Sequence, residues 1–276
     1  MKTVGIVACS NGQKEEYRSQ NDELAAYLES TGRKVISGNC IYEKNGPFSG
    51  TGKERAAELM KFFGNPGIDE IYDISGGDIA NQILQDLDYE VIRGSRAVFW
   101  GYSDLTTVIN AIYARTGKSS VLYQVKNLVW EDKELQRRRF ESEEELFSPD
   151  FRFVRGESME GIVIGGNIRC FLKLAGTRYF PDVRGKVLLL ESLGGEVPKT
   201  ITSLAQLKQL GVFDQVNGIL LGTFTQKEAK KCQPDIITLV KEFVGENVPI
   251  AHTAEIGHGK DSKAIRIGER IRIADQ

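Results

Sequence analysis

The chain has 276 residues but only two histidines, His252 and His258, so any reaction that needs an imidazole must use one of them. His258 lies between Gly257 and Gly259, which predicts a loop with unusual backbone freedom rather than a core position. His252 ends a predicted strand over residues 248–252, where a structural role is the simpler interpretation. His258 is therefore the candidate general base.

A serine stands between a predicted strand over residues 97–100 and a predicted helix over residues 105–115, in the turn Gly101-Tyr102-Ser103-Asp104. Such a turn places a hydroxyl at the carboxyl edge of a parallel sheet, where open α/β sheets bind their ligands. The unpaired N–H groups at the helix start also suit a developing oxyanion. Taken alone, a plain helix N-cap explains Ser103 slightly better, because Ser and Asp both favour that position.

Glu191 follows the apolar strand predicted over residues 186–190. Its carboxylate is either partly desolvated at the sheet edge or faces water. Ser103, Glu191 and His258 then form a nucleophile, an acid and a base in that chain order. A serine hydroxyl needs an adjacent base, and the base needs a carboxylate to fix its tautomer. The α/β-hydrolase fold uses the same order, but its G-x-S-x-G turn requires glycine where Leu105 stands. An esterase on that fold is therefore the weaker hypothesis.

Short apolar runs alternate with amphipathic stretches along most of the chain, which is typical of α/β proteins with parallel strands. The remaining predicted strands cover residues 3–8, 34–37, 70–74, 121–125, 161–164 and 218–221, and the remaining helices cover residues 20–30, 51–63, 79–87, 169–174, 202–210 and 235–244. Thr51 and Glu54 have the spacing of a capping box. The alternating segment 264–273 predicts a terminal hairpin.

Residues 131–145 carry seven acids and four bases, a composition typical of a solvated helix or linker. We therefore predict an N-terminal domain over residues 1–126 that carries the nucleophile. A charged connecting segment over residues 127–160 follows. A C-terminal domain over residues 161–276 then carries Glu191 and His258.

The overall composition excludes several classes of function. Lys and Arg number 36 and Asp and Glu 38, so the net charge of −2 gives no field to gather nucleic acid or anionic lipid. No run approaches the roughly 18–20 apolar residues that span a bilayer, and the first residues resemble a strand more than a signal peptide. The four cysteines show no CxxC spacing, so we expect neither a zinc site nor a redox pair. We expect free thiols, which suit a reducing cytoplasm.

Several motifs, in their order along nearly the whole chain, resemble the LD-carboxypeptidase family of serine peptidases, which includes the microcin C self-immunity proteins. These motifs are Thr51 with Glu54-Arg55-Ala56 and Leu59, Gly76-Gly77, Asn81 with Leu84 and Leu87-Asp88-Tyr89, Gly101 to Thr106, Ile164-Gly165-Gly166-Asn167, Gly176-Thr177 with Pro181, Leu190-Glu191, and Gly257-His258-Gly259. The stretch from Gly76 to Tyr89 resembles the microcin-immunity branch more than the murein branch. Cys9-Ser10 and Gln124-Val125 depart from the common Pro-Ser and Gly-Pro, which leaves the substrate open.

The resemblance implies a Rossmann-like parallel-sheet domain, a smaller C-terminal α/β domain, and an active site between them. It also implies a cytoplasmic homodimer that needs no metal or cofactor. Ser103, Glu191 and His258 would form the catalytic triad, and the backbone N–H groups of Gly77 and Asp104 would form the oxyanion hole. Substrate contacts are expected from Gly76, Tyr102, Asn167 and Arg178.

The expected reaction is hydrolysis of a C-terminal amide bond through an acyl-enzyme. The substrate would be a murein tetrapeptide or a peptidyl or aminoacyl nucleotide. The candidates for binding its carboxylate are Arg55, Arg178 and Lys199. The candidates for stacking on a nucleotide base are Tyr123, Trp130 and Phe180, although such aromatic residues more often only pack in the core. The alternative is a non-catalytic protein that binds a small ligand or peptide on the same scaffold.

Overall fold

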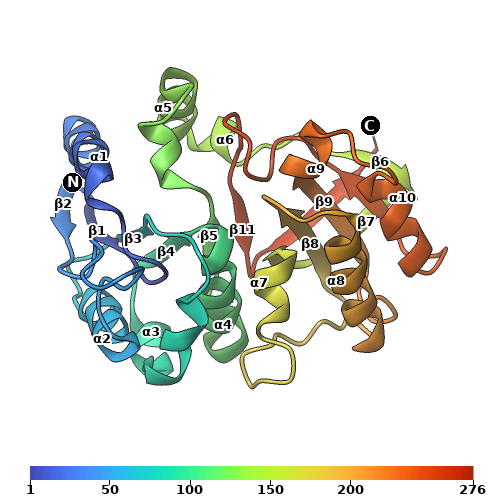
Figure 1. The fold of residues 1–276 in the computed structure, drawn as a ribbon, viewed down its shortest axis with the longest axis horizontal. Coiled ribbons are helices and arrows are strands. Elements are labelled where there is room, and N and C mark those ends of the chain that lie inside the picture. Colours follow the sequence, from blue (N-terminus) through green and yellow to red (C-terminus); the bar gives the residue numbers. More distant parts are fainter. Residues whose placement is uncertain (276) are drawn as a thin grey trace.

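The structure is a computed structural model that describes residues 1–275 and contains two six-stranded sheets side by side (Figure 1). The first sheet has the order β11-β5-β4-β3-β1-β2, with β1 (Thr3–Val7), β2 (Lys34–Ser37), β3 (Glu70–Asp73), β4 (Val98–Gly101), β5 (Ser120–Leu122) and β11 (Ile265–Ile267). The second has the order β12-β7-β8-β9-β10-β6, with β6 (Arg152–Arg155), β7 (Ser158–Asn167), β8 (Val187–Ser192), β9 (Gly218–Phe224), β10 (Ile250–His252) and β12 (Arg270–Ala274).

Both sheets are parallel in their centres and antiparallel at their edges. In the first sheet β1 to β5 run parallel and only β11 is antiparallel. In the second, β7 to β10 run parallel, and β12 and β6 are the antiparallel edge strands. Parallel strands end at one edge, so each sheet presents a row of strand ends that can build a site.

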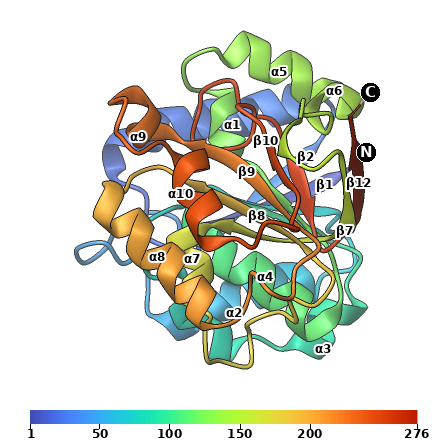
Figure 2. The ribbon, with the colours of Figure 1, turned by 90° about the vertical axis from the view of Figure 1, so that its right-hand side faces the viewer.

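Helices cover both faces of the first sheet (Figures 1 and 2). Those of the N-terminal half are α1 (Arg18–Ser30), α2 (Gly52–Phe63), α3 (Tyr89–Gly94), α4 (Thr106–Thr116), α5 (Lys133–Glu141) and α6 (Glu143–Leu146), with 3₁₀ helices η1 (Glu15–Tyr17), η2 (Ala80–Asp86), η3 (Ser103–Leu105) and η4 (Val125–Leu128). Those of the C-terminal half are α7 (Ile168–Leu172), α8 (Val197–Gln209), α9 (Thr225–Ala229) and α10 (Ile236–Phe243). Of these, α7, α8 and α10 pack on one face of the second sheet. Within residues 1–275 no helix is long and apolar enough to cross a membrane.

Burial on both faces explains why the central strands are continuous apolar runs. All six residues of β8 are buried; Val187 and Leu189 join one core cluster, and Leu188 and Leu190 join another on the opposite face. The cluster that contains Leu189 also contains Phe99 of the first sheet. The two domains therefore share one of their hydrophobic cores.

A side-chain amide fastens the two domains at the same junction. Asn110 of α4 donates to the carbonyl oxygen of Gly165 at 2.8 Å and accepts from its N–H at 2.9 Å. Asn110 and Gly165 are both buried, so these two hydrogen bonds satisfy polar groups that water cannot reach at the domain boundary. The strand β7 is thereby held against the helix that follows the candidate nucleophile.

The capping box is confirmed, because Thr51 accepts from the N–H of Glu54 and the Glu54 carboxylate accepts from the N–H of Thr51. The predicted terminal hairpin is wrong. Ile265 and Ile267 pair with β5, whereas Ile271 and Ile273 belong to β12, which pairs with β7. Both halves of the segment form strands, as the alternation predicts, but each half joins a different sheet.

Between these two strands lies Gly268, where φ is 91°; its N–H donates to the carbonyl oxygen of Val163 in β7 at 2.8 Å. Figure 1 shows β11, in red, beside β5 of the N-terminal half. Sheet membership therefore crosses the predicted domain boundaries. β11 from residues 161–276 completes the first sheet, and β6 from the 127–160 connecting segment lies in the second.

Candidate active site

The turn after β4 holds Ser103 in a strained backbone conformation. Its φ is 52°, a left-handed value that costs a non-glycine residue about 1–2 kcal/mol. Such strain is concentrated at functional sites, and serine nucleophiles on strand-to-helix turns show it. Gly101 makes the turn possible, because a Cβ there would lie 2.7 Å from Cβ of Leu105. The N-cap positions of η3 and α4 are Tyr102 and Leu105, so Ser103 does not cap a helix.

The imidazole of His258 is paired with the carboxylate that ends β8. Nδ1 of His258 lies 2.8 Å from Oε2 of Glu191, whose side chain is fully buried. Because a carboxylate only accepts hydrogen bonds, this pairing assigns the imidazole proton to Nδ1 and leaves Nε2 as an acceptor. Structure and sequence thus agree on which of the two histidines meets a carboxylate.

Tyr102 supports the same pair from the residue before Ser103. Its hydroxyl lies 3.3 Å from Oε2 of Glu191 and 3.2 Å from Nδ1 of His258, and the two rings are 4.6 Å apart between centroids. Burial, and then the negative charge of Glu191, raise the pKa of Tyr102 well above its ordinary value. The hydroxyl therefore stays protonated and donates to the carboxylate.

Two glycines bring the His258 loop against the end of β9. The N–H of Thr223 donates to the carbonyl oxygen of Ile256 at 2.7 Å. A Cβ on Gly222 would lie 2.3 Å from that same oxygen, and a Cβ on Gly257 would lie 1.8 Å from Oγ1 of Thr223. Any larger residue at either position would push the loop, and with it His258, away from Glu191.

The second ring nitrogen of His258 is poised for another partner. Nε2 is buried and makes no hydrogen bond with any described residue, and the same holds for Oε1 of Glu191. Ser103 follows Tyr102, which contacts both Glu191 and His258, but Ser103 is not hydrogen-bonded to Nε2 in this structure. Hydrogen bonds between nucleophile and base are often long until a substrate binds.

Gly76 and Gly77 follow β3 and lie beside the nucleophile. A Cβ on Gly76 would be 4.0 Å from Cβ of Ser103, and Gly77 lines the same cavity as Ser103. Gly77 has a φ of 127°, and a Cβ there would lie 2.2 Å from Oδ1 of Asn11. Only glycine fits this position, which keeps the backbone of residue 77 next to the serine.

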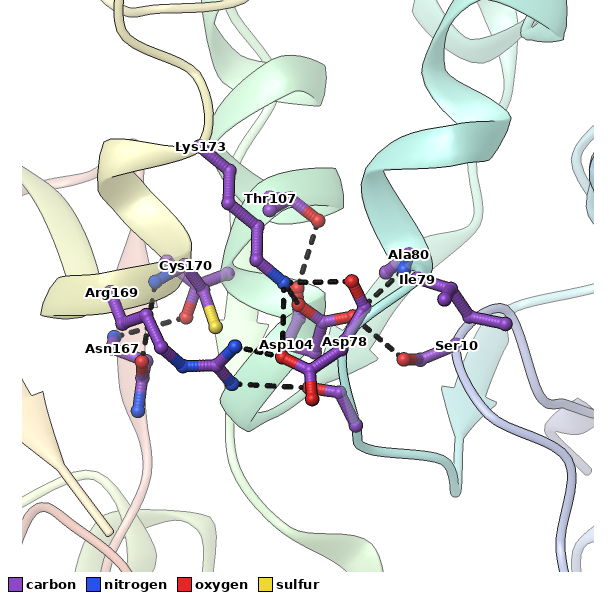
Figure 3. Close-up of polar contacts among 12 residues, drawn as sticks. Ser10, Asp78, Ile79, Ala80, Asp104, Thr107, Asn167, Arg169, Cys170 and Lys173 are labelled. Atoms are coloured by element: carbon purple, nitrogen blue, oxygen red, sulfur yellow. Dashed lines mark hydrogen bonds and ion pairs between the residues drawn. The ribbon is translucent and has the colours of Figure 1, made fainter. Parts of the chain in front are cut away.

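Asp104 follows the serine, and its carboxylate is fully buried. Figure 3 shows the polar contacts of this carboxylate. Oδ2 accepts from the hydroxyl of Ser10 at 2.7 Å and from the N–H of Ala80 at 2.8 Å. These bonds tie the nucleophile turn to the loops after β1 and β3. Among the described residues, the N–H groups of Gly77 and Asp104 donate to no hydrogen bond.

A cavity of about 620 Å³ opens at Ser103 between the two sheets. Its lining residues are Gly77, Asp78, Ser103, Asn167, Ile168, Arg169, Ser192, Leu193, Gly194, Gly195, Lys199, Thr200, Thr202 and Ser203. Asn167 combines this position with a structural role, because its side chain accepts from the N–H of Cys170 at 3.3 Å and caps α7. Lys199, which forms no ion pair with any described residue, adds a positive charge to the wall.

The proposed carboxylate binder Arg55, the proposed substrate contact Tyr102, and Arg178, a candidate for both roles, do not line this cavity. Arg55 is almost fully buried and donates to backbone carbonyls, including that of Gly50. Arg178 is exposed and packs over the ring of Tyr179, away from the cavity lining. Tyr102 is buried outside the cavity lining and contacts Glu191 and His258.

The proposed stacking aromatics are also outside the lining. Tyr123 is buried and donates to Gln136 at 2.7 Å, and Phe180 packs on Phe171 with 4.9 Å between ring centroids. Trp130 is partly exposed beside Lys126. Tyr123 and Phe180 therefore serve packing, and none of the three lines the cavity that contains Ser103. A separate hollow of about 650 Å³ runs along β12 and contains no triad residue.

The other histidine has a different environment. His252 ends β10, and burial lowers its pKa below the ordinary value. His252 does not line the cavity that contains Ser103, and it forms no hydrogen bond with a carboxylate of any described residue. Within residues 1–275 no group of three or more His, Cys, Asp or Glu side chains is arranged to hold a metal ion.

Comparison with known proteins gives matches along most of the chain. The model of the LD-carboxypeptidase N-terminal domain matches residues 4–123, and that of the C-terminal domain matches residues 160–273. The probable murein peptide carboxypeptidase of Bacillus subtilis is 29% identical, over 98% of this chain and 88% of its own length. The microcin C7 self-immunity protein MccF of Escherichia coli is 25% identical, over 98% and 89%.

Solved structures show the same two-domain α/β fold. MccF in complex with glutamyl sulfamoyl guanosine superimposes with a TM-score of 0.89, at 22% identity, over 99% of this chain and 93% of that one. Muramoyltetrapeptide carboxypeptidase from Oxalobacter formigenes gives 0.83, at 20% identity, over 100% and 96%. The chain therefore belongs to the LD-carboxypeptidase family and is a serine-type carboxypeptidase.

Proposed function

We propose that Ser103, Glu191 and His258 form a catalytic triad that hydrolyses a C-terminal amide bond through an acyl-enzyme. The observation that carries this proposal is the pairing of His258 Nδ1 with the buried carboxylate of Glu191 at 2.8 Å. It leaves Nε2 free to accept a proton, and Ser103, in the turn that also carries Tyr102, is held at a φ of 52°. A base oriented by a carboxylate is what a serine hydroxyl needs to become a nucleophile.

In the proposed reaction, Nε2 of His258 takes the proton of Ser103 as its oxygen attacks the substrate carbonyl. The N–H groups of Gly77 and Asp104 donate to the oxyanion of the tetrahedral intermediate. His258 then gives its proton to the leaving amine, and the C–N bond breaks. A water molecule, deprotonated by His258, releases the acyl group from Ser103 in the second half.

The substrate would present an anionic group to Lys199. This residue brings a positive charge to the cavity wall, whereas the guanidinium of Arg55 is engaged with the backbone. Two substrate classes carry such a group: a murein tetrapeptide, as the name of the Bacillus relative indicates for that protein, through its C-terminal carboxylate, and an aminoacyl or peptidyl nucleotide through its phosphate. MccF structures contain aspartyl sulfamoyl adenosine, a compound of the second class.

A side-by-side kinetic comparison of a murein tetrapeptide and an aminoacyl sulfamoyl adenosine tests the proposal. We expect hydrolysis of at least one of them, with Ser103→Ala as the inactive control and a higher KM in Lys199→Met. An unchanged rate in Ser103→Ala would remove the triad assignment. The substrate with the higher kcat/KM would identify the class.

We propose further that the enzyme works as a homodimer in the cytoplasm. All four cysteines are unpaired, and three of them are buried, which suits a reducing compartment. Sedimentation of the purified protein gives the oligomeric state, with a monomer at micromolar concentration as the contradicting result. Fractionation of the producing cell gives the location.

A further inference from the structure

Cations from the C-terminal half hold together the two loops that carry the proposed oxyanion donors. Arg169 and Lys173 lie four residues apart, on α7 and at its C-terminal end. Arg169 forms an ion pair with Asp78 and donates to the carbonyl oxygen of Gly77 at 3.2 Å. Lys173 donates to the carbonyl oxygen of Asp78 at 2.9 Å and to Oδ1 of Asp104 at 2.6 Å (Figure 3).

The ammonium group of Lys173 is therefore a bridge between two segments far apart in sequence. It contacts the carbonyl oxygen of Asp78, the residue after Gly77, and the carboxylate of Asp104. The Asp104 carboxylate is fully buried, and Lys173 is its only ion-pair partner among the described residues. A buried carboxylate that loses its counter-charge is strongly unfavourable, so the loops would rearrange without the lysine.

We propose that Lys173, assisted by Arg169, is a positioning residue that fixes the spacing between the N–H groups of Gly77 and Asp104. The inference rests on the proposed function, because it concerns the oxyanion hole of that reaction. Oxyanion donors act only within a narrow range of distance, so a small shift of either loop weakens the stabilisation of the intermediate. The clamp comes from the helix that follows β7, so the oxyanion hole is complete only when the two domains are docked.

The test is the rate at which Ser103 reacts with a fluorophosphonate. In this reaction the serine oxygen bonds to phosphorus, fluoride leaves, the serine proton goes to His258, and the phosphoryl oxygen occupies the oxyanion hole. We expect Lys173→Met to react about tenfold more slowly or worse, and Lys173→Arg, which keeps the cation, to stay within about threefold of wild type. Lys241→Met, on the exposed side of α10, is the matched control and should react at the wild-type rate.

Steady-state kinetics separate positioning from a merely structural role. We expect kcat of Lys173→Met to fall by a factor similar to that of the labelling rate, with KM within about twofold, because the clamp acts on the intermediate and not on substrate binding. If Lys173→Met does not fold, as judged by its thermal unfolding, Lys173→Gln replaces it. This variant keeps a donor for the carbonyl oxygen of Asp78.

Two results would overturn the clamp. One is labelling of Lys173→Met, or of its replacement, at the wild-type rate. The other is an equal loss in Lys173→Arg and Lys173→Met, since the cation would then be irrelevant. Failure of the wild-type protein to react at all would instead count against the proposed function.

Discussion

The turn that carries Ser103 and the loop that carries His258 are held in different ways. The turn is fixed by polar contacts that reach several segments, through the buried carboxylate of Asp104 and its bonds to Ser10, Ala80 and Lys173. The loop is fixed by close backbone packing at Gly222 and Gly257 within its own domain. The position of the proposed nucleophile thus depends on charge and on contacts with the second domain, whereas that of the proposed base depends on two positions that leave no room for a side chain.

Removal of the nucleophile should have the largest effect. We expect Ser103→Ala to lower kcat by about 10⁴–10⁶-fold with little change in KM, because the cavity walls that bind substrate stay in place. The free energy of unfolding should change little, because alanine tolerates the positive φ no better than serine does. Steady-state kinetics and urea denaturation measure both quantities. A residual rate above about one hundredth of wild type would contradict the assignment.

The two histidines offer a matched pair. His258→Gln should lower kcat by about 10⁴-fold, because the base is lost while the loop backbone stays packed on β9. His252→Gln, at the end of β10, should retain activity within about twofold. Equal losses in the two variants would mean that His258 acts only through structure.

The oxyanion loop should give the next largest effect. Gly77→Ala forces a Cβ to within 2.2 Å of Asn11 Oδ1 at a φ that alanine rarely adopts. The backbone N–H must move, and we expect kcat to fall by about 10²–10³-fold. Gly32→Ala, whose Cβ would meet nothing within 4 Å at a φ of 80°, is the control for backbone strain alone. A wild-type kcat in Gly77→Ala would exclude residue 77 from the oxyanion hole.

Tyr102 should matter less, because it supports Glu191 without touching the reacting atoms. We expect Tyr102→Phe to lower kcat/KM by about tenfold. The raised pKa of Tyr102 keeps its hydroxyl protonated, so the ratio of wild type to variant should stay constant from about pH 6 to about pH 9. A ratio that declines with rising pH in that range would show that the hydroxyl ionises.

The smallest effect concerns stability and the second histidine. Burial lowers the pKa of His252 in the folded state, so the unfolded chain binds the proton more tightly. Stability is therefore fully present above the unfolded pKa, near 6.5, and falls as the pH drops through it. Denaturation at about pH 7.5 and about pH 5.5 should show a larger loss in wild type than in His252→Gln. An identical loss would contradict this linkage.

Much of this site could be predicted from sequence because its residues stand at the ends of apolar runs. Ser103 and Glu191 follow buried strands, and the glycines around His258 mark a loop. The cations Arg169 and Lys173 were missed, although their spacing of four residues places them on one helix face directly after Asn167. The residues that they contact lie far away in the sequence, so no local pattern could predict these contacts.

The corrections have the same origin. The pattern over residues 264–273 showed two amphipathic strands but could not show that each pairs with a different sheet. Arg178 and Arg55 were plausible partners for an anion by charge alone. Tertiary packing decides otherwise, since one stacks on Tyr179 and the other is enclosed by backbone carbonyls.

Mass spectrometry of the fluorophosphonate-treated protein tests the central claim most directly. The triad predicts a single adduct on the peptide that contains Ser103 in the wild-type protein, and a rate of formation reduced by several orders of magnitude in His258→Gln. An adduct on any other serine, or equal labelling of the two proteins, would contradict it.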